Sequence, residues 1–177
     1  MNKEKIEKAV YDLLLAIGED PTREGLIDTP KRVAKMYQEL LTQEVIKYTT
    51  FQDNYDDIII VKDIEFTSMC EHHLLPFYGI AHIAYIPNGK IIGLSKIARI
   101  VEKHSKKLQV QERMTDDILN ELKDKLNTDN IAIYIEAKHM CMIARGVKKE
   151  LSKTITVKLN GQFKTEKKND FYSLIKN

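Results

Sequence analysis

The hydrophobic pattern of the chain begins with two segments of helical spacing. The first ends at Gly18, a residue that favours the end of a helix, and the second begins at Thr29-Pro30, where proline fits the first turn. Their apolar positions are Ile6, Val10, Leu13, Leu14 and Ile17, and then Val33, Met36, Tyr37, Leu40 and Leu41. Apolar residues that recur every three to four positions share one helix face. The pattern therefore predicts two N-terminal helices.

The period then changes from helical to strand-like. A β-branched run, IIIV, follows Asp57, and Ile64 and Phe66 continue in alternation. A second strand is expected over residues 79–86. It is followed by Asn88-Gly89, a dipeptide typical of tight hairpin turns. These signals predict neighbouring antiparallel strands.

Two further strands are predicted in the last third of the chain. Alternating apolar residues begin at Ile131, and the alternation continues through His139 to Cys141. The segment ITVKL, residues 155–159, precedes the turn signal Asn160-Gly161. On this interpretation His139 and Cys141 lie on one strand and point to the same face.

Two helices are predicted between these pairs of strands. Ser95 is the expected cap of the first helix and Thr115 the expected cap of the second. Their apolar faces are Ile97, Ile100, Val101, His104 and Leu108, and then Ile118, Leu119, Leu122 and Leu126. The order α-α-β-β-α-α-β-β, with a short terminal helix, favours an α+β fold in which helices back an antiparallel sheet.

The 177 residues suit a single domain, for which we expect an N-terminal helical part, residues 1–50, and a catalytic part, residues 51–165. The net formal charge is only +2, so the chain lacks the polybasic field of nucleic-acid binders and membrane-surface proteins. The N-terminus mixes acids and bases through its apolar positions, which is typical of neither a signal peptide nor a spanning segment. We expect a cytoplasmic protein that binds neither nucleic acid nor membrane.

The strongest chemical signal is TSMCEHHLLPF, residues 67–77, where Cys70 and His73 have the close spacing of metal ligands. Cys141 is a candidate third ligand, because the predicted strand would direct it and His139 to one face. Two thiolates and one imidazole would leave the fourth position of zinc open to water, as in catalytic sites. His72 and His139 would then be available for proton transfer.

Other interpretations of this cluster stay open. One histidine could complete a closed Cys₂His₂ structural site, or the adjacent histidines could be surface residues. The two cysteines, Cys70 and Cys141, are too few for a disulfide framework, and a disulfide between them is the minor alternative.

A second group of candidates could bind an anionic ligand with a planar base. Lys96 and Arg99 share a face at the start of a predicted helix, an arrangement that suits phosphate. Gln111 and Glu112 follow, and a buried carboxylate there could accept hydrogen bonds from the amino group and ring N–H of guanine. The alternative for the basic residues is a solvated charged face.

Several motifs in order resemble GTP cyclohydrolase I: DPTREGLIDTPKRVAKMY, CEHHLLPF, AYIP, GLSKIARIV, QVQERMT and EAKHMCMIARG. The resemblance runs from about Val10 to about Phe163. It implies the tunnelling fold and a zinc enzyme that opens the imidazole ring of GTP, releases formate and forms 7,8-dihydroneopterin triphosphate, the first step towards folate and other pterins. It also implies a homodecamer with active sites at subunit interfaces.

The resemblance implies a role for each candidate residue. Zinc ligands would be Cys70, His73 and Cys141, with water on the open position. Catalytic residues would be His139, as donor of a proton to N7 of the base, His72, for other proton transfers, and Ser95, for the ribose rearrangement. Substrate-binding residues would be Glu112 and Gln111 for guanine, and Lys96, Arg99, Arg145 and Arg32 for the triphosphate.

Two other classes of protein compete with this interpretation. A zinc-stabilised binding module without catalysis would have a closed tetrahedral metal shell. Another tunnelling-fold enzyme, such as a pterin-handling aldolase or a nitrile reductase, would share the fold and the base-binding carboxylate, but lacks the CEHH and HMC pair. A zinc nucleoside deaminase is disfavoured because no H-x-E pairs with P-C-x-x-C.

Overall fold

The structure is a computed structural model that describes residues 1–176. The chain divides into two compact units, the first from Met1 to Thr42 and the second from Gln43 onward. Each unit is described by itself. No helix among residues 1–176 is both long and apolar enough to cross a membrane.

The first unit consists of helices α1 (Lys3–Ala16) and α2 (Thr29–Leu41), which pack against each other. The side chain of Asn2 accepts a hydrogen bond from the backbone N–H of Lys5 and so caps α1. Proline stands at the first turn of α2, where its missing N–H costs nothing. Both N-terminal helices are as the sequence predicted.

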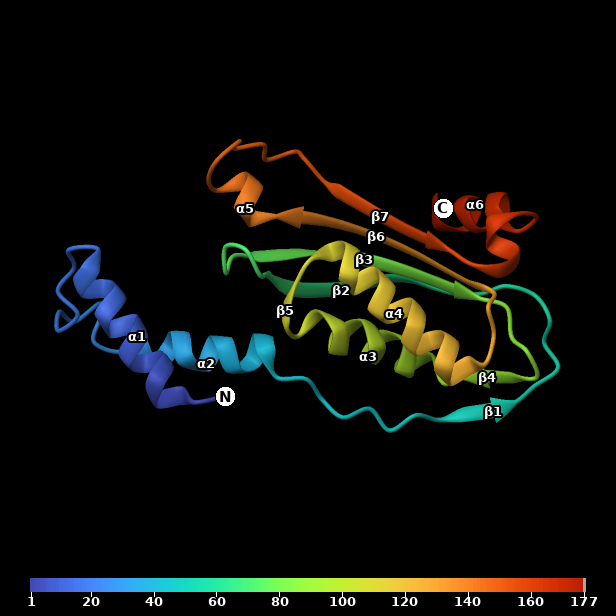
Figure 1. The fold of residues 1–177 in the computed structure, drawn as a ribbon, viewed down its shortest axis with the longest axis horizontal. Coiled ribbons are helices and arrows are strands. Elements are labelled where there is room, and N and C mark those ends of the chain that lie inside the picture. The colour runs from blue at the N-terminus through green and yellow to red at the C-terminus, as the bar shows by residue number, and fades with distance from the viewer. Residues whose placement is uncertain (177) are drawn as a thin grey trace. The chain divides into compact units, whose positions relative to one another are not determined.

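The second unit is built around a five-stranded sheet in the order β5-β2-β3-β6-β7 (Figure 1). Strands β2 (Ile59–Cys70), β3 (Pro76–Tyr85), β6 (Ile131–His139) and β7 (Thr154–Leu159) pair with one another in this order, and each of these pairs is antiparallel. The two-residue β5 (Leu108–Gln109) is parallel to the end of β2. This short parallel pairing brings residues just before α4 beside the end of β2.

The turn at Asn88-Gly89 forms as predicted, but the two strands that it connects do not pair with each other. Strand β4 (Lys90–Ile92) follows this turn, but it pairs with β1 (Thr50–Gln52) in a separate two-stranded sheet and not with β3. Gly89 has a positive φ of 74°, so the turn chemistry was identified correctly. A turn dipeptide fixes local backbone geometry, while the pairing partner depends on contacts that are distant in sequence.

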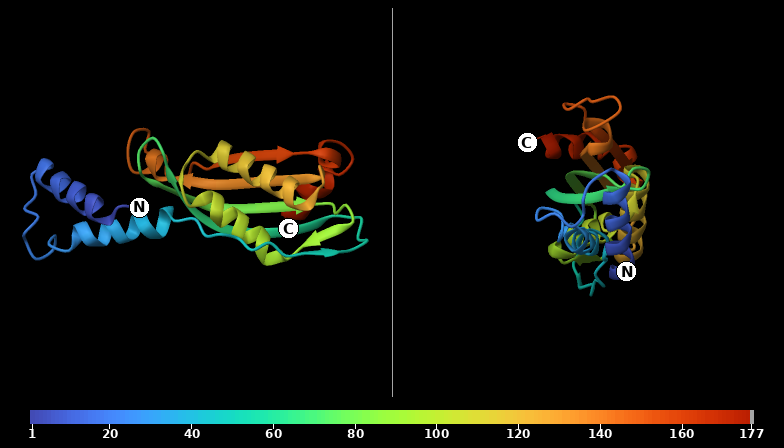
Figure 2. Two further views of the ribbon diagram at one scale, coloured as in Figure 1. Left: turned by 60° about the horizontal axis from the view of Figure 1, so that its bottom comes forward. Right: turned by 90° about the vertical axis from the view of Figure 1, so that its left-hand side faces the viewer.

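Helices α3 (Leu94–Ser105) and α4 (Gln111–Leu126) cover one face of the sheet (Figures 1 and 2). Their apolar faces and the facing strand residues form the main core, which includes Phe66, Phe77, Ile83, Ile100, Met114, Ile118, Leu122, Ile133 and Ile135. The α+β fold with an antiparallel sheet backed by helices is confirmed.

The predicted caps of these two helices are wrong. Gly93 is the residue before α3, and Ser95 lies inside the first turn. Thr115 lies within α4, where its hydroxyl donates to the backbone carbonyl of Gln111 at 2.8 Å. Each helix begins earlier than expected. The cap signal is ambiguous, because a serine or threonine hydroxyl can bond within a helix as well as cap one.

The opposite face of the sheet is covered only in part. The short helix η1 (Gly161–Lys164) and helix α6 (Lys168–Lys176) pack there over the small cluster Ala84, Ile86, Ala132, Phe163 and Phe171. Elsewhere on this face Tyr78 and Ile155 are exposed. In β3, a side chain at Gly79 would place a Cβ atom 1.9 Å from the carbonyl oxygen of Glu136 in β6, so only glycine allows this close strand pairing.

The end of β6 differs from the prediction. The strand stops at His139, and Cys141 lies in the one-turn helix α5 (Met140–Ile143). The two residues therefore do not share one strand face. Apolar alternation continues through the boundary, so the sequence pattern alone could not reveal the change from strand to helix.

Candidate active site

The turn that follows β2 positions two of the candidate metal ligands. The backbone N–H of Cys70 donates to the carbonyl of Leu75 at 2.9 Å, and the carbonyl of Cys70 accepts from Leu74 at 2.9 Å. Leu74 takes a positive φ of 53°, which closes the turn tightly before β3 begins. This places Nδ1 of His73 3.8 Å from Sγ of Cys70.

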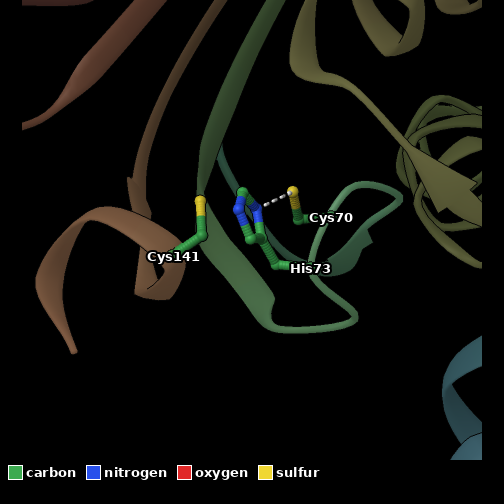
Figure 3. A group of neighbouring side chains, drawn as sticks. All are labelled: Cys70, His73 and Cys141. Atoms are coloured by element: carbon green, nitrogen blue, oxygen red, sulfur yellow. Dashed lines mark hydrogen bonds between the residues drawn. The ribbon is translucent and has the colours of Figure 1, made fainter. Parts of the chain in front are cut away.

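The third candidate ligand arrives from α5. Sγ of Cys141 and the ligand atoms of Cys70 and His73 all lie within 4.8 Å of one another (Figure 3). The sequence argument identified Cys141 through a shared strand face with His139, but the structure brings it in through a helical turn. Two segments that are far apart in the sequence, the end of β2 with the turn that follows it and α5, thus meet at one point.

The donor atoms of this group suit a zinc ion. Two thiols and one imidazole are the borderline-soft ligands that zinc prefers, and their mutual separations allow one ion to contact all three. Burial raises the pKa of Cys141, and the neighbouring Cys70 raises it further. A divalent cation would counter both effects, because it stabilises the thiolate form.

The other two histidines near this group do not join it. Within residues 1–176 the group has three members, and both cysteines are free. The side chain of His72 is 65% exposed and lies 3.8 Å from the carboxylate of Glu71. Nε2 of His139 is instead 2.8 Å from Oε1 of Gln111. The described residues therefore do not form a closed Cys₂His₂ shell.

A hollow of about 240 Å³ adjoins the three ligands. Its lining includes seven of the candidate site residues, namely Cys70, His72, His73, Gln111, Glu112, His139 and Cys141. The hollow is smaller than most drug-sized ligand pockets, which occupy about 300–1,000 Å³.

His139 is held firmly at the edge of this hollow. Its ring is stacked on Phe77, with ring centroids 4.7 Å apart and planes within 1° of parallel. Burial lowers the pKa of His139, and the charge of Glu112 opposes this effect. Glu112 itself is exposed in the first turn of α4, and within residues 1–176 its side chain makes no hydrogen bond or ion pair. Its carboxylate is available to a ligand.

The remaining candidates lie outside the hollow. Ser95, Lys96 and Arg99 are in the first half of α3, where Ser95 and Arg99 are exposed. Arg145 is exposed just after α5. Arg32 belongs to the first compact unit, where its guanidinium lies 3.3 Å from the carboxylate of Asp28.

The turn after β2, which carries two candidate metal ligands, has a support that the sequence did not predict. Glu71, between two candidate ligands in the sequence, forms an ion pair with Arg113. Nε of Arg113 also donates to Oε1 of the buried Gln109 at 2.7 Å, and the backbone N–H of Glu71 donates to the carbonyl of Gln109 at 3.1 Å. The sequence shows that Glu71 lies between two candidate ligands, but it gives no indication that Arg113 is the partner of this carboxylate.

Comparison with known proteins gives a consistent result over nearly the whole chain. The family model described as GTP cyclohydrolase I matches residues 6–176. A protein named GTP cyclohydrolase 1 from Streptococcus agalactiae is 55% identical, over 94% of this chain and 92% of its own. Proteins of the same name from Caldanaerobacter subterraneus subsp. tengcongensis and Clostridium kluyveri are 53% and 50% identical, and the alignments cover 95% and 99% of this chain and 93% and 99% of theirs.

Proposed function

Since the chain belongs to the GTP cyclohydrolase I family and is a hydrolase of that kind, we propose that it uses zinc held by Cys70, His73 and Cys141. It opens the imidazole ring of GTP, releases C8 as formate and rearranges the remainder to 7,8-dihydroneopterin triphosphate. This product serves tetrahydrofolate and pterin biosynthesis. The observation that carries the proposal is a group of three metal-ligating side chains beside the same hollow as Glu112 and His139.

The number of ligands supports a catalytic and not a structural role for the metal. Structural zinc sites have four protein ligands, whereas catalytic sites have three and an open position. When bound, zinc supplies a Lewis acid that activates water near neutral pH. The thiolates of Cys70 and Cys141 offset the charge of the cation, and the turn between β2 and β3 holds the imidazole of His73 against them.

Glu112 recognises the guanine base in this proposal. Its carboxylate accepts hydrogen bonds from the exocyclic amino group and the ring N–H of guanine, a pair of donors that adenine does not offer at the same edge. The support is its position on the hollow without a partner among residues 1–176.

Two histidines and a serine handle the remaining chemistry. His139 donates a proton to N7 of the base, which makes C8 more electrophilic, and His72 assists proton transfers around the ring and the ribose. Both line the hollow. Ser95 serves the ribose rearrangement, and since it is not part of the hollow of its own chain, it acts in this proposal from a neighbouring subunit.

The triphosphate is bound by Lys96, Arg99, Arg145 and Arg32, contributed by more than one subunit of a homodecamer. Lys96 and Arg99 do not line the hollow within one chain, which supports a shared site. Strand β7 is at the edge of the sheet, and such an edge offers free backbone groups for pairing with another chain. The assembly would therefore complete the small hollow of each chain.

We propose one functional domain with a helical part, residues 1–50, and a catalytic part, residues 51–165. The first compact unit ends at Thr42 in the sequence, which is close to the proposed end of the helical part. The three metal ligands and Glu112 fall within the catalytic part.

The experiment is incubation of metal-replete protein with GTP, followed by assay of formate and of the fluorescent pterin that forms on oxidation. ATP is the matched control substrate, and we expect it to remain unchanged because Glu112 requires the donors of guanine. Release of formate and pterin in equal amounts from GTP alone would support the proposal. The absence of both products from zinc-loaded protein would overturn it.

A further inference from the structure

The side chain of Gln111 has no free hydrogen-bonding group. It is 1% exposed, and its Nε2 lies 3.1 Å from each of three acceptors, the backbone carbonyls of Ile135 and Thr154 and the hydroxyl of Thr156, which share its two hydrogens. Its Oε1 faces Nε2 of His139 at 2.8 Å. The sequence predicts that Gln111 contacts guanine, but a saturated and buried amide cannot do so without breaking these bonds.

The contacts of Gln111 define which end of its amide points at His139. Backbone carbonyls can only accept hydrogen bonds, so the NH₂ end of Gln111 must face Ile135 and Thr154. These two carbonyls belong to β6 and to the first residue of the paired strand β7. The carbonyl end of the amide is then directed at His139 by the sheet itself.

This orientation decides how His139 carries its proton. Oε1 of Gln111 can only accept, so Nε2 of His139 must be the donor, and the neutral ring has its hydrogen on Nε2. Nδ1 is then the nitrogen with a free lone pair. The one side-chain hydrogen bond of His139 within residues 1–176 is made through Nε2, and the residue borders the hollow. The stacking on Phe77 restrains the ring plane as well.

We propose that Gln111 is a positioning residue that acts through His139: it binds Nε2 of the ring and so leaves Nδ1 as the nitrogen available to a ligand in the hollow; this inference rests on the proposed function. The sheet fixes the amide of Gln111, and the amide together with Phe77 fixes the ring of His139. The ring therefore presents the same nitrogen without rotating.

The test uses zinc-loaded wild-type protein and Gln111→Met, which keeps the length of the side chain but cannot accept from Nε2. We expect turnover to fall by about tenfold to a hundredfold, with zinc content and KM for GTP changed less than threefold. Thr128→Val is the matched control, because it also removes a buried hydrogen bond, from Thr128 to the carbonyl of Ile86, at the distant end of β6. It should lower the melting temperature without changing turnover.

A spectroscopic measurement separates positioning from mere stability. In protein with ¹⁵N-labelled histidine, wild type should show a slowly exchanging Nε2–H proton of His139, assigned by its loss in His139→Ala. Gln111→Met should lose this signal or exchange it faster. Unchanged turnover in Gln111→Met, or a wild-type ring that carries its hydrogen on Nδ1, would overturn the inference.

The two proposals fail in different ways. If wild-type protein released no formate from GTP, the proposed function would fail, yet the ¹⁵N spectrum would still report which nitrogen of His139 carries the hydrogen. If Gln111→Met does not fold, the wild-type spectrum alone decides the assignment, since it requires no variant of Gln111.

Discussion

Two partly buried histidines in the second unit, His139 and His104, are held by a carboxamide and a carboxylate respectively. His139 has a neutral partner, Gln111, and borders the hollow. His104, in α3, has Nε2 2.5 Å from the carboxylate of Glu121 in α4, and Lys103 lies 2.8 Å from the same carboxylate. One ring faces an open space and the other faces a packed interface between two helices.

The charged side chains around His104 are paired with one another. Glu121 also accepts from the hydroxyl of Tyr48, and Asp117 on the next turn of α4 is paired with Lys107 at 2.7 Å. Nδ1 of His104 is buried without a hydrogen-bond partner among the described residues, 3.8 Å from Asp117. No ligand could reach this ring without displacing its neighbours.

The comparison shows how a protein can use one residue type for two purposes. At His104 the polar groups neutralise each other and join α3 to α4, so the expected contribution is to stability. At His139 a neutral acceptor fixes one nitrogen and leaves the other free, in a residue that lines the same hollow as the candidate metal ligands, so the expected contribution is to chemistry. Each prediction below tests one side of this distinction.

Removal of a metal ligand should have the largest effect. Cys141→Ser should lose most bound zinc and about a thousandfold or more of the GTP ring-opening activity, because a hydroxyl is a poor substitute for a thiolate. The cluster around His104 contains no metal ligand and should stay intact. Zinc content, activity and circular dichroism of one preparation check this, and full zinc stoichiometry in the variant would contradict the ligand assignment.

Replacement of the two histidines should separate chemistry from stability. His139→Ala should retain near-stoichiometric zinc and GTP binding but lose about a hundredfold or more in turnover, the range for a positioned acid or base. His104→Ala should retain turnover within about threefold and unfold at a lower temperature, because it leaves Glu121 without one of its partners. Loss of zinc in His139→Ala would contradict its assignment to chemistry, and loss of activity in His104→Ala would contradict its assignment to stability.

The pH dependence of stability should report on His104. Burial lowers its pKa to about 4, with Asp117 opposing this effect and Lys103 and Lys107 adding to it. The short contact engages Nε2, so a second proton would have to bind the buried and unpartnered Nδ1. The unfolded chain, with a histidine pKa of about 6.5, binds more protons between pH 6.5 and 4.

Stability should therefore fall as the pH falls through this window. The pKa difference of about 2.5 units corresponds to at most about 3.5 kcal/mol, because each unit is worth about 1.4 kcal/mol. Glu121 has the opposite sign, since burial raises its pKa, and it reduces the total. Urea unfolding of wild type and His104→Gln at several pH values measures the difference. An equal slope against pH in both proteins would remove His104 from this role.

Much of the fold could be predicted because it depends on local periodicity. The helical spacing from Ile6 to Ile17 and the alternation in β2 and β6 each follow from burial of one face, and the helix and strand core is where the pattern placed it. The predictions of the fold are wrong at positions where one local sequence signal is compatible with two structures. Thr115 could cap a helix or lie within one, and Asn88-Gly89 could join β4 to any strand that its register allowed.

For the candidate site, spacing could place Cys70 beside His73 but could not show which atoms meet. Cys141 was selected by a strand geometry that the structure replaces with a helical turn. The contacts of Gln111 with Thr154 and of Glu71 with Arg113 join residues more than 40 positions apart, and nothing in the local sequence encodes them. Chemical type is readable from sequence, whereas orientation depends on the assembled sheet.

The smallest expected effect concerns the support of the metal-binding turn by Arg113. Its guanidinium is shared between Glu71 and the buried Gln109, which ties the turn after β2 to the start of α4. Groups that orient metal ligands without touching the metal commonly change metal affinity by about 10–100-fold when removed. Arg113 is itself exposed and acts through the backbone of the turn, so we expect the lower end, about tenfold weaker zinc binding in Arg113→Met.

Competition with a chromogenic zinc chelator measures this affinity without reference to activity. Arg23→Met is the matched control, because Arg23 forms an exposed ion pair with Glu19 at 3.0 Å in the first unit and should leave zinc affinity unchanged. Glu71→Gln should weaken binding in the same way as Arg113→Met, and the double variant should add little, because the two residues act through one contact. Additive losses in the double variant would show that Arg113 and Glu71 support the turn independently, and unchanged affinity in Arg113→Met would show that the turn needs no such support.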